Sequence, residues 1–309
     1  MPFANCFMSN ANPVTRGFHA VVRDPGLFFM EVLWRWTFGV AAFLLLFYAV
    51  RVLSHSVVIT DADEIAWRGR DAMAISAALL RVADESGGKL LSMALFVSPA
   101  ITLLWVVLGA LGRVATLKRL LRDTHEVRWS TILGLQLWRA IAMWVGTLVW
   151  IGTIGIEGQI SMHGDQPDFA LYYIMVLPSL LLIGVVWSIV MWYLALAPIC
   201  ALDDVTIFGA VRRARTLGRS HRAELGSVSV LSGILRVAGL MIAFVLCVAT
   251  SGWLGPHPNA YTAWVVAVSL VYFAFADFLF AARQASFVEI VAGAAVPAAG
   301  APAEPTPAR

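Results

Sequence analysis

Charged residues are scarce in this chain. They make up 13% of its 309 residues, with 22 Lys and Arg against 19 Asp and Glu. Soluble domains carry about 25% charged and ~45–50% hydrophobic residues, whereas 60% of this chain is hydrophobic. That balance excludes an ordinary soluble domain. A formal net charge of only +3 also gives no basis for binding nucleic acid, which requires a dense basic surface.

Cysteines and catalytic motifs are scarce as well. The three cysteines, Cys6, Cys200 and Cys247, have no partners at the spacing of a disulfide or a zinc site. The glycine-rich phosphate loops, the zinc-protease helix motif and the nucleophile elbow of hydrolases are all missing. We therefore expect no enzymatic activity, no cofactor and no metal. The outer loops contain Glu157, His163, Asp165, Asp168 and His257. We interpret them as solvated loop residues, with metal binding as the less favoured alternative.

Long hydrophobic runs, by contrast, are abundant. Each of six runs matches or exceeds the ~20 residues that a helix needs to cross the hydrocarbon core of a bilayer. The runs cover residues 27–53, 90–112, 137–157, 171–199, 228–250 and 260–282. The sequence therefore predicts an all-α integral membrane protein, with a six-helix transmembrane domain over residues 27–291.

The positions of the Lys and Arg residues predict the orientation of this domain. Basic residues gather in the second and fourth connections between the runs, and none occurs in the third or fifth. The first connection is the longest and mixes basic with acidic residues. By the positive-inside rule, we expect both termini in the cytoplasm, with residues 1–26 as a cytoplasmic N-terminal segment.

Interfacial amphipathic helices are predicted in the first, second and fourth connections. In the first, an acidic stretch from Asp61 opens a short helix. A second helix begins after Asp71 and is expected to end at Gly87 and Gly88. Its apolar residues recur at helical spacing, which favours a position on the outer membrane face. The Ala- and Pro-rich residues 292–309 cannot bury enough surface to fold, so they predict a disordered tail.

The fourth connection predicts a basic amphipathic helix over about residues 205–222. Asp203 and Asp204 precede it and are candidates to cap its N-terminus. Its basic side consists of Arg212, Arg213, Arg215, Arg219 and Arg222. Such a helix beside membrane spans is suited to binding anionic lipids of the cytoplasmic leaflet. In the alternative interpretation it fixes the topology and packs beneath the helix bundle.

The same region, about residues 195–225, resembles a known family. The resemblance is carried by Pro198, Asp203, Ala210, Ala214 and Leu217. This pattern is similar to that of the YciC-type six-helix bacterial inner-membrane proteins, in which a proline-ended helix and an acidic residue precede an Ala-x-x-x-Ser-x-x-Leu helix. The chain departs from the pattern at Ala214, where the family has serine. The resemblance implies a multi-pass protein of the bacterial inner (plasma) membrane without an assigned reaction.

Three charged residues, Arg139, Arg236 and Asp277, fall inside the predicted spans. At 1.5 Å per residue, Arg236 and Asp277 lie about 12 Å and about 8 Å from the cytoplasmic side. An ionisable residue within the membrane indicates a functional site by default, and similar depths favour an ion pair between these two. Alternatively, the arginines extend towards the headgroups, or the pair only holds the helices together.

Two further patterns relate the spans to one another. Arg-x-x-Ser/Thr followed by a bulky apolar residue recurs after each even-numbered span, starting at Arg113, Arg213 and Arg283. It indicates either three similar helical hairpins or only the arginines that the positive-inside rule requires. In the fifth span, Ser229 and Gly233 form a small-xxx-small pair, which predicts a close-packing face.

These patterns favour a non-enzymatic protein with a structural or accessory role. Its partners would be anionic membrane lipids, a membrane protein or a second copy of the chain. The alternative is a small transporter or lipid-handling channel, whose polar pathway would pass Arg139, Arg236 and Asp277 in the cytoplasmic third of the bundle. Transporters usually show broken helices at matching positions in two halves, and the prolines within these spans do not correspond in that way.

Overall fold

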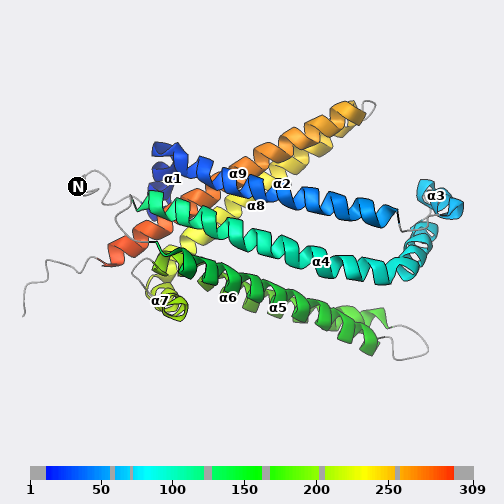
Figure 1. Cartoon of the computed structure of the whole chain (residues 1–309), viewed down its shortest axis with the longest axis horizontal. Helices are drawn as coiled ribbons and strands as arrows, with labels where there is room; N and C mark the ends of the chain where they lie inside the picture. Colours follow the sequence, from blue (N-terminus) through cyan, green and yellow to red (C-terminus); the bar gives the residue numbers. More distant parts are fainter. Residues whose placement is uncertain are drawn as a thin grey trace, which may run out of the picture. The chain divides into compact units, whose positions relative to one another are not determined.

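The architecture is that of a multi-pass membrane protein (Figure 1). The computed structural model describes residues 12–55, 60–69, 72–121, 127–161, 168–201, 206–254 and 258–295. Within these residues all regular structure is helical. Six of the helices are long and apolar enough to cross a membrane by length and composition, which confirms the predicted all-helical architecture and six candidate spans.

Each predicted span lies within a different long helix. These helices are α2 (Pro25–Ser54), α4 (Ala72–Leu120), α5 (Trp129–Ser161), α6 (Phe169–Cys200), α8 (Arg222–Leu254) and α9 (Pro258–Ala295). The shorter helices are α1 (Pro13–Arg23), α3 (Asp61–Arg68) and α7 (Ile207–Ser220). The long helices extend past the hydrophobic runs. Once a helix has formed, each further residue adds one backbone hydrogen bond, so the helix can continue into polar surroundings.

One prediction about the connections is wrong, and another has no counterpart among the described residues. Gly87 and Gly88 do not end a helix, because α4 runs through both without interruption. A glycine inside a helix costs only about 1 kcal/mol relative to alanine, which the flanking helical sequence can overcome. In the second connection, α4 continues to Leu120, and no separate interfacial helix occurs in its described residues. The predicted tail falls mostly outside the described chain, although α9 extends to Ala295.

The chain divides into two compact units. One comprises residues 1–32 and 110–309, and the other comprises residues 33–109. We refer to them as the large unit and the small unit. The small unit contains most of α2 and α4, together with α3.

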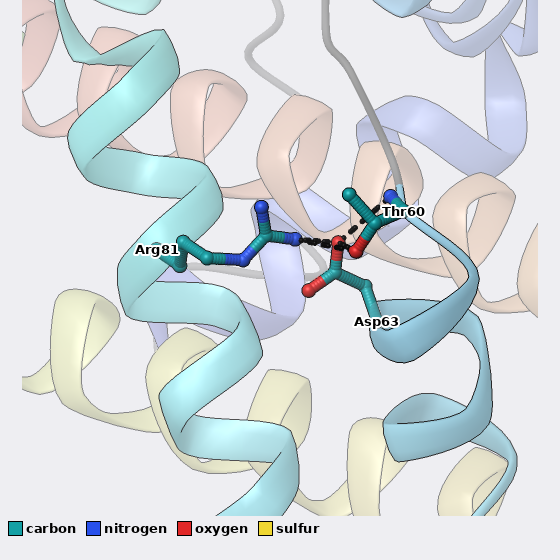
Figure 2. A network of polar contacts seen from close by, with 3 residues as sticks. All are labelled: Thr60, Asp63 and Arg81. Atoms are coloured by element: carbon teal, nitrogen blue, oxygen red, sulfur yellow. Dashed lines mark hydrogen bonds and ion pairs between the residues drawn. The ribbon is translucent and has the colours of Figure 1, made fainter.

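In the small unit, α3 is joined to α4 by a polar network (Figure 2). The Asp63 carboxylate accepts hydrogen bonds from the backbone N–H and the hydroxyl of Thr60, at 2.9 and 2.8 Å. Arg81 of α4 forms an ion pair with the same carboxylate, and its Nη2 donates to the Thr60 hydroxyl at 3.1 Å. Asp63 is only 2% exposed. The acidic stretch from Asp61 therefore opens a helix as predicted, and Arg81 supplies a tie that the sequence did not reveal.

The core of the large unit lies where the ends of several helices meet. Its buried residues come from α1, the end of α4, the start of α5, the end of α6, α7, the start of α8 and the end of α9. They include Val14, Leu117, Ile132, Leu196, Ile199, Ala210, Leu225, Val228 and Phe287. Beyond this core, α5 packs against α6 and α8 packs against α9. The most apolar stretches of α6 and α8 are each only 6% buried. Such exposed apolar surface is typical of helices that face lipid.

Candidate functional site

The basic helix α7 is anchored through residues without bulky side chains. Ala210, Ala214 and Gly218 are buried and recur every four residues along one side of the helix. That side packs on α6: a Cβ added at Gly218 would lie 2.9 Å from a ring atom of Tyr193 and 3.0 Å from one of Trp192. The small stripe thus allows α7 to approach α6 closely, so α7 is held in one orientation.

The N-terminus of α7 is capped by Thr206, whose hydroxyl oxygen accepts a 3.3 Å hydrogen bond from the backbone N–H of Gly209. The predicted capping by Asp203 or Asp204 concerns residues outside those that the structure describes. Ala214, the departure from the YciC-type pattern, is fully buried against the core. A hydroxyl group at this position would need a hydrogen-bond partner inside the contact, whereas alanine needs none.

All five predicted arginines of this helix and its continuation into α8 are exposed. They are Arg212, Arg213, Arg215, Arg219 and Arg222. The small stripe of α7 faces the core, and its arginines face away from it. We call these five residues the basic face. Helix α7 therefore packs against its neighbours and also presents a basic surface. The two alternative interpretations of this helix do not exclude each other.

The three predicted intramembrane charges lie in different surroundings. Asp277 of α9 is 5% exposed, Arg139 of α5 is half-buried and Arg236 of α8 is exposed. Neither Arg139 nor Asp277 is without an interaction partner. No hydrogen bond or ion pair of Arg236 occurs among the described residues. The exposed position of Arg236 gives no support to the predicted Arg236–Asp277 ion pair, which stays a prediction.

In the large unit, polar side chains of α2, α4 and α9 are buried. Glu31 is fully buried, and its Oε2 accepts a 3.3 Å hydrogen bond from the Thr116 hydroxyl. Arg113, one helical turn before Thr116, is 5% exposed, and its guanidinium carbon lies 4.5 Å from the ring centroid of Phe280. The i,i+4 spacing of Glu31 and Arg35 predicted an ion pair within one helix, and nothing in the sequence indicated the contact between Glu31 and Thr116. We call Glu31, Arg113, Thr116 and Asp277 the buried polar residues.

The Arg-x-x-Ser/Thr pattern corresponds to similar burial at two of its three positions. Thr116 and Ser286 are buried, and so are the apolar residues that follow them, Leu117 and Phe287. In α7, however, Arg213 and Thr216 of the same pattern are exposed. The pattern thus does not mark three equivalent environments.

Helix α1 is held to α9 in the large unit. A Cβ added at Gly17 would overlap the Ser286 hydroxyl and lie 2.5 Å from the Ala282 carbonyl oxygen. Next to this contact, Arg16 forms a 3.4 Å ion pair with Glu289. Glycine is therefore required at position 17 for the two backbones to approach this closely.

The connection between α1 and α2 is tied to the end of α4. Arg119 binds the Asp24 carboxylate with two hydrogen bonds of 2.8 and 2.7 Å. The pair is partly exposed, so solvent screens its attraction and its contribution to stability is small. Together with the Gly17 contact, it fixes the entry of the chain into α2.

Glu157 is a further buried carboxylate and lies near the C-terminal end of α5. The sequence predicted a solvated loop residue at this position, and that prediction is wrong, because Glu157 lies inside α5 and is only 8% exposed. Its Oε1 accepts a 2.6 Å hydrogen bond from the Ser179 hydroxyl of α6, while Oε2 has no hydrogen-bond partner. The residue links the two helices through one hydrogen bond only.

No group of three or more His, Cys, Asp or Glu residues is placed to hold a metal ion in the described part of the chain. His163, Asp165 and His257 lie outside that part. No protein-family model, curated protein or solved structure matches this chain. The six long apolar helices indicate the class of protein, which is that of multi-pass membrane proteins.

Proposed function

We propose that the chain is a non-enzymatic protein of the inner membrane, with a structural or accessory role exerted through anionic lipids of the cytoplasmic leaflet. The single observation that carries this proposal is the orientation of α7. Its small stripe is packed on α6, so its arginines are exposed together and in fixed positions. The proposal places both termini and α7 on the cytoplasmic side, in line with the Lys and Arg distribution. It also agrees with the resemblance of residues 195–225 to YciC-type proteins.

The physical basis is the potential of the cytoplasmic leaflet. Each Lys or Arg near an anionic surface contributes about 1 kcal/mol, so the five arginines of the basic face would supply several kcal/mol together. Because α7 is already ordered, little conformational entropy is lost on contact with the lipids. The interaction would gather anionic lipids around this end of the protein, where a membrane protein partner or a second copy would meet them.

The test is the lipid selectivity of the full-length protein reconstituted in mixed bilayers. Spin-labelled phosphatidylglycerol and phosphatidylcholine report the lipids that are motionally restricted at the protein surface. We expect the wild type to select phosphatidylglycerol, and the triple substitution Arg212→Gln, Arg215→Gln, Arg219→Gln to reduce that selectivity. A matched variant, Arg51→Gln with Arg68→Gln, removes exposed arginines of the small unit and should keep it. Equal selectivity in all three proteins would contradict the proposal.

The buried polar residues favour a second candidate, a small transporter or lipid-handling channel. Glu31, Arg113, Thr116 and Asp277 are all at most 5% exposed, and all belong to the large unit. Polar groups within spans mark pathways when they line a hydrated cavity. Reconstitution into vesicles with a fluorescent lipid and an external quencher separates the two functions. Lipid movement between leaflets that is lost in Asp277→Asn would favour the channel over the accessory role.

A further inference from the structure

One face of α8 carries polar residues at a spacing of two helical turns. Arg222, Ser229 and Arg236 are seven residues apart, and seven residues of an α-helix return to nearly the same face. At 1.5 Å per residue, Arg222 and Arg236 are about 21 Å apart along the axis. We call this side of the helix the Arg236 face.

Near its start, the Arg236 face contacts α6. The indole N–H of Trp192 donates a 3.1 Å hydrogen bond to the Ser229 hydroxyl. Further along α8, a Cβ added at Gly233 would meet no atom within 4 Å, and Arg236 itself is exposed. On α6, Val185 lies two turns before Trp192 and is 49% exposed. The described chain therefore leaves the face open beyond Ser229, and the predicted close packing at Gly233 does not occur within one copy.

An arginine in this position requires an anionic partner. The α8 span is strongly apolar, and Ile234 and Val237 beside Arg236 are exposed as membrane-facing residues would be. A guanidinium group facing hydrocarbon is costly unless it meets a carboxylate, a phosphate or water. No hydrogen bond or ion pair of Arg236 within the described chain provides such a partner.

The geometry of the helix directs the Arg236 side chain. Side chains of an α-helix tilt towards its N-terminus, which for α8 is the end at Arg222 and α7. Gly233 and Ser229, the small residues on that path, leave room for a long side chain to lie along the helix. Arginine can thus extend towards the headgroups of the leaflet on the α7 side while its aliphatic part stays in hydrocarbon.

We propose that the Arg236 face binds an anionic phospholipid of that leaflet. The lipid phosphate would lie between Arg236 and Arg222, beside the Ser229 hydroxyl, and its acyl chains would cover the exposed apolar residues of α6 and α8. Charge complementarity favours this occupant, because both charged residues of the face are basic. The only acidic residue in the first turn of α8, Glu224, lies 3.5 Å from His221, off this face. The inference rests on the proposed function, which supplies the orientation of α8, but it uses residues other than those tested on α7.

The test is retention of phosphatidylglycerol by the purified full-length protein in mild detergent, measured by native mass spectrometry. From the contribution of one arginine near a charged surface, we expect Arg236→Gln to retain about fivefold less phosphatidylglycerol than the wild type. Arg236→Lys keeps the charge and should restore most of it. Arg51→Gln, an exposed arginine of the small unit outside the basic face and the Arg236 face, should retain as much as the wild type.

A second variant guards against loss of the fold. Gly233→Leu places a side chain on the open face, where an added Cβ meets no atom within 4 Å, and replaces a poor helix former, so it should fold and still retain less phosphatidylglycerol. Wild-type retention in both Arg236→Gln and Gly233→Leu would overturn the proposal. So would displacement of the lipid by millimolar inorganic phosphate, which indicates a site for the free ion. Loss of a dimer in Arg236→Gln with unchanged lipid retention would assign the face to a second copy and overturn it as well.

Discussion

The Thr116 hydroxyl of α4 donates a hydrogen bond to the fully buried carboxylate of Glu31 in α2, over an Oγ1–Oε2 distance of 3.3 Å. It joins residues 85 positions apart in the sequence, and Arg113 lies one turn away from it in α4. A carboxylate so completely withdrawn from solvent depends on such donors, because loss of one leaves buried negative charge unsatisfied. This contact therefore joins the start of α2 to the end of α4 within the large unit.

Thr116→Val should lower the free energy of unfolding by about 1–3 kcal/mol, because it removes the donor and leaves the Glu31 oxygen buried. Unfolding of the purified protein in detergent, followed by circular dichroism, measures the change. Thr147→Val is the matched control, since the Thr147 hydroxyl donates to the Met143 carbonyl oxygen of its own helix, and it should cost much less. Equal losses in the two variants would show that the Glu31 contact contributes nothing specific.

Gly17→Ala should destabilise the packing of α1 on α9 by about 1–3 kcal/mol or more, because the added methyl group overlaps Ser286 and the Ala282 carbonyl. Gly226→Ala is the control: a Cβ there meets nothing within 4 Å, so the helix propensity of alanine should stabilise α8 by up to about 1 kcal/mol. Thermal unfolding in detergent compares the two. A stable Gly17→Ala protein would mean that α1 does not rest on α9 as described.

Glu157→Gln should leave stability nearly unchanged or raise it. The glutamine carbonyl can still accept the hydrogen bond of Ser179, while the charge with its unsatisfied Oε2 is removed from apolar surroundings. In the wild-type background, Ser179→Ala should cost about 1 kcal/mol, and a double-mutant cycle of the two changes isolates their coupling. A large loss in Glu157→Gln alone would indicate that the ionised carboxylate has a partner or a function of its own.

The six spans could be predicted from the sequence because bilayer thickness dictates the length of a hydrophobic run, and no knowledge of neighbours is needed. The amphipathic character of α7 was predictable for the same local reason, but its apolar side was expected to consist of Phe208, Val211 and Leu217. That detail is wrong: the buried side is formed by the small residues Ala210, Ala214 and Gly218, and Phe208 is 73% exposed. The end of a helix was less predictable. Gly87 and Gly88 looked like a stop, but the cost of glycine is small beside the helical preference of the sequence around it.

The polar sites were harder to predict, because burial of a charged residue depends on which helices lie beside it. Asp277 and Arg236 have similar predicted depths, yet Asp277 is covered by its neighbours and Arg236 is exposed. Hydropathy could not distinguish them, since it contains no information on the direction in which each residue points. Glu157 and Glu31 were underestimated for the same reason: each is buried through contact with another helix.

The central claim of the account is that the basic end of the protein, with α7, faces the cytoplasm and its anionic lipids. The most direct test labels single cysteines in intact cells with a membrane-impermeant maleimide, in a protein whose cysteines are first replaced by Cys6→Ser, Cys200→Ala and Cys247→Ala. The account predicts that Asn259→Cys, at the start of α9, reacts from outside the cytoplasm, and that Arg219→Cys reacts only after the membrane is opened. Labelling of position 219 in intact cells, with position 259 protected, would contradict it.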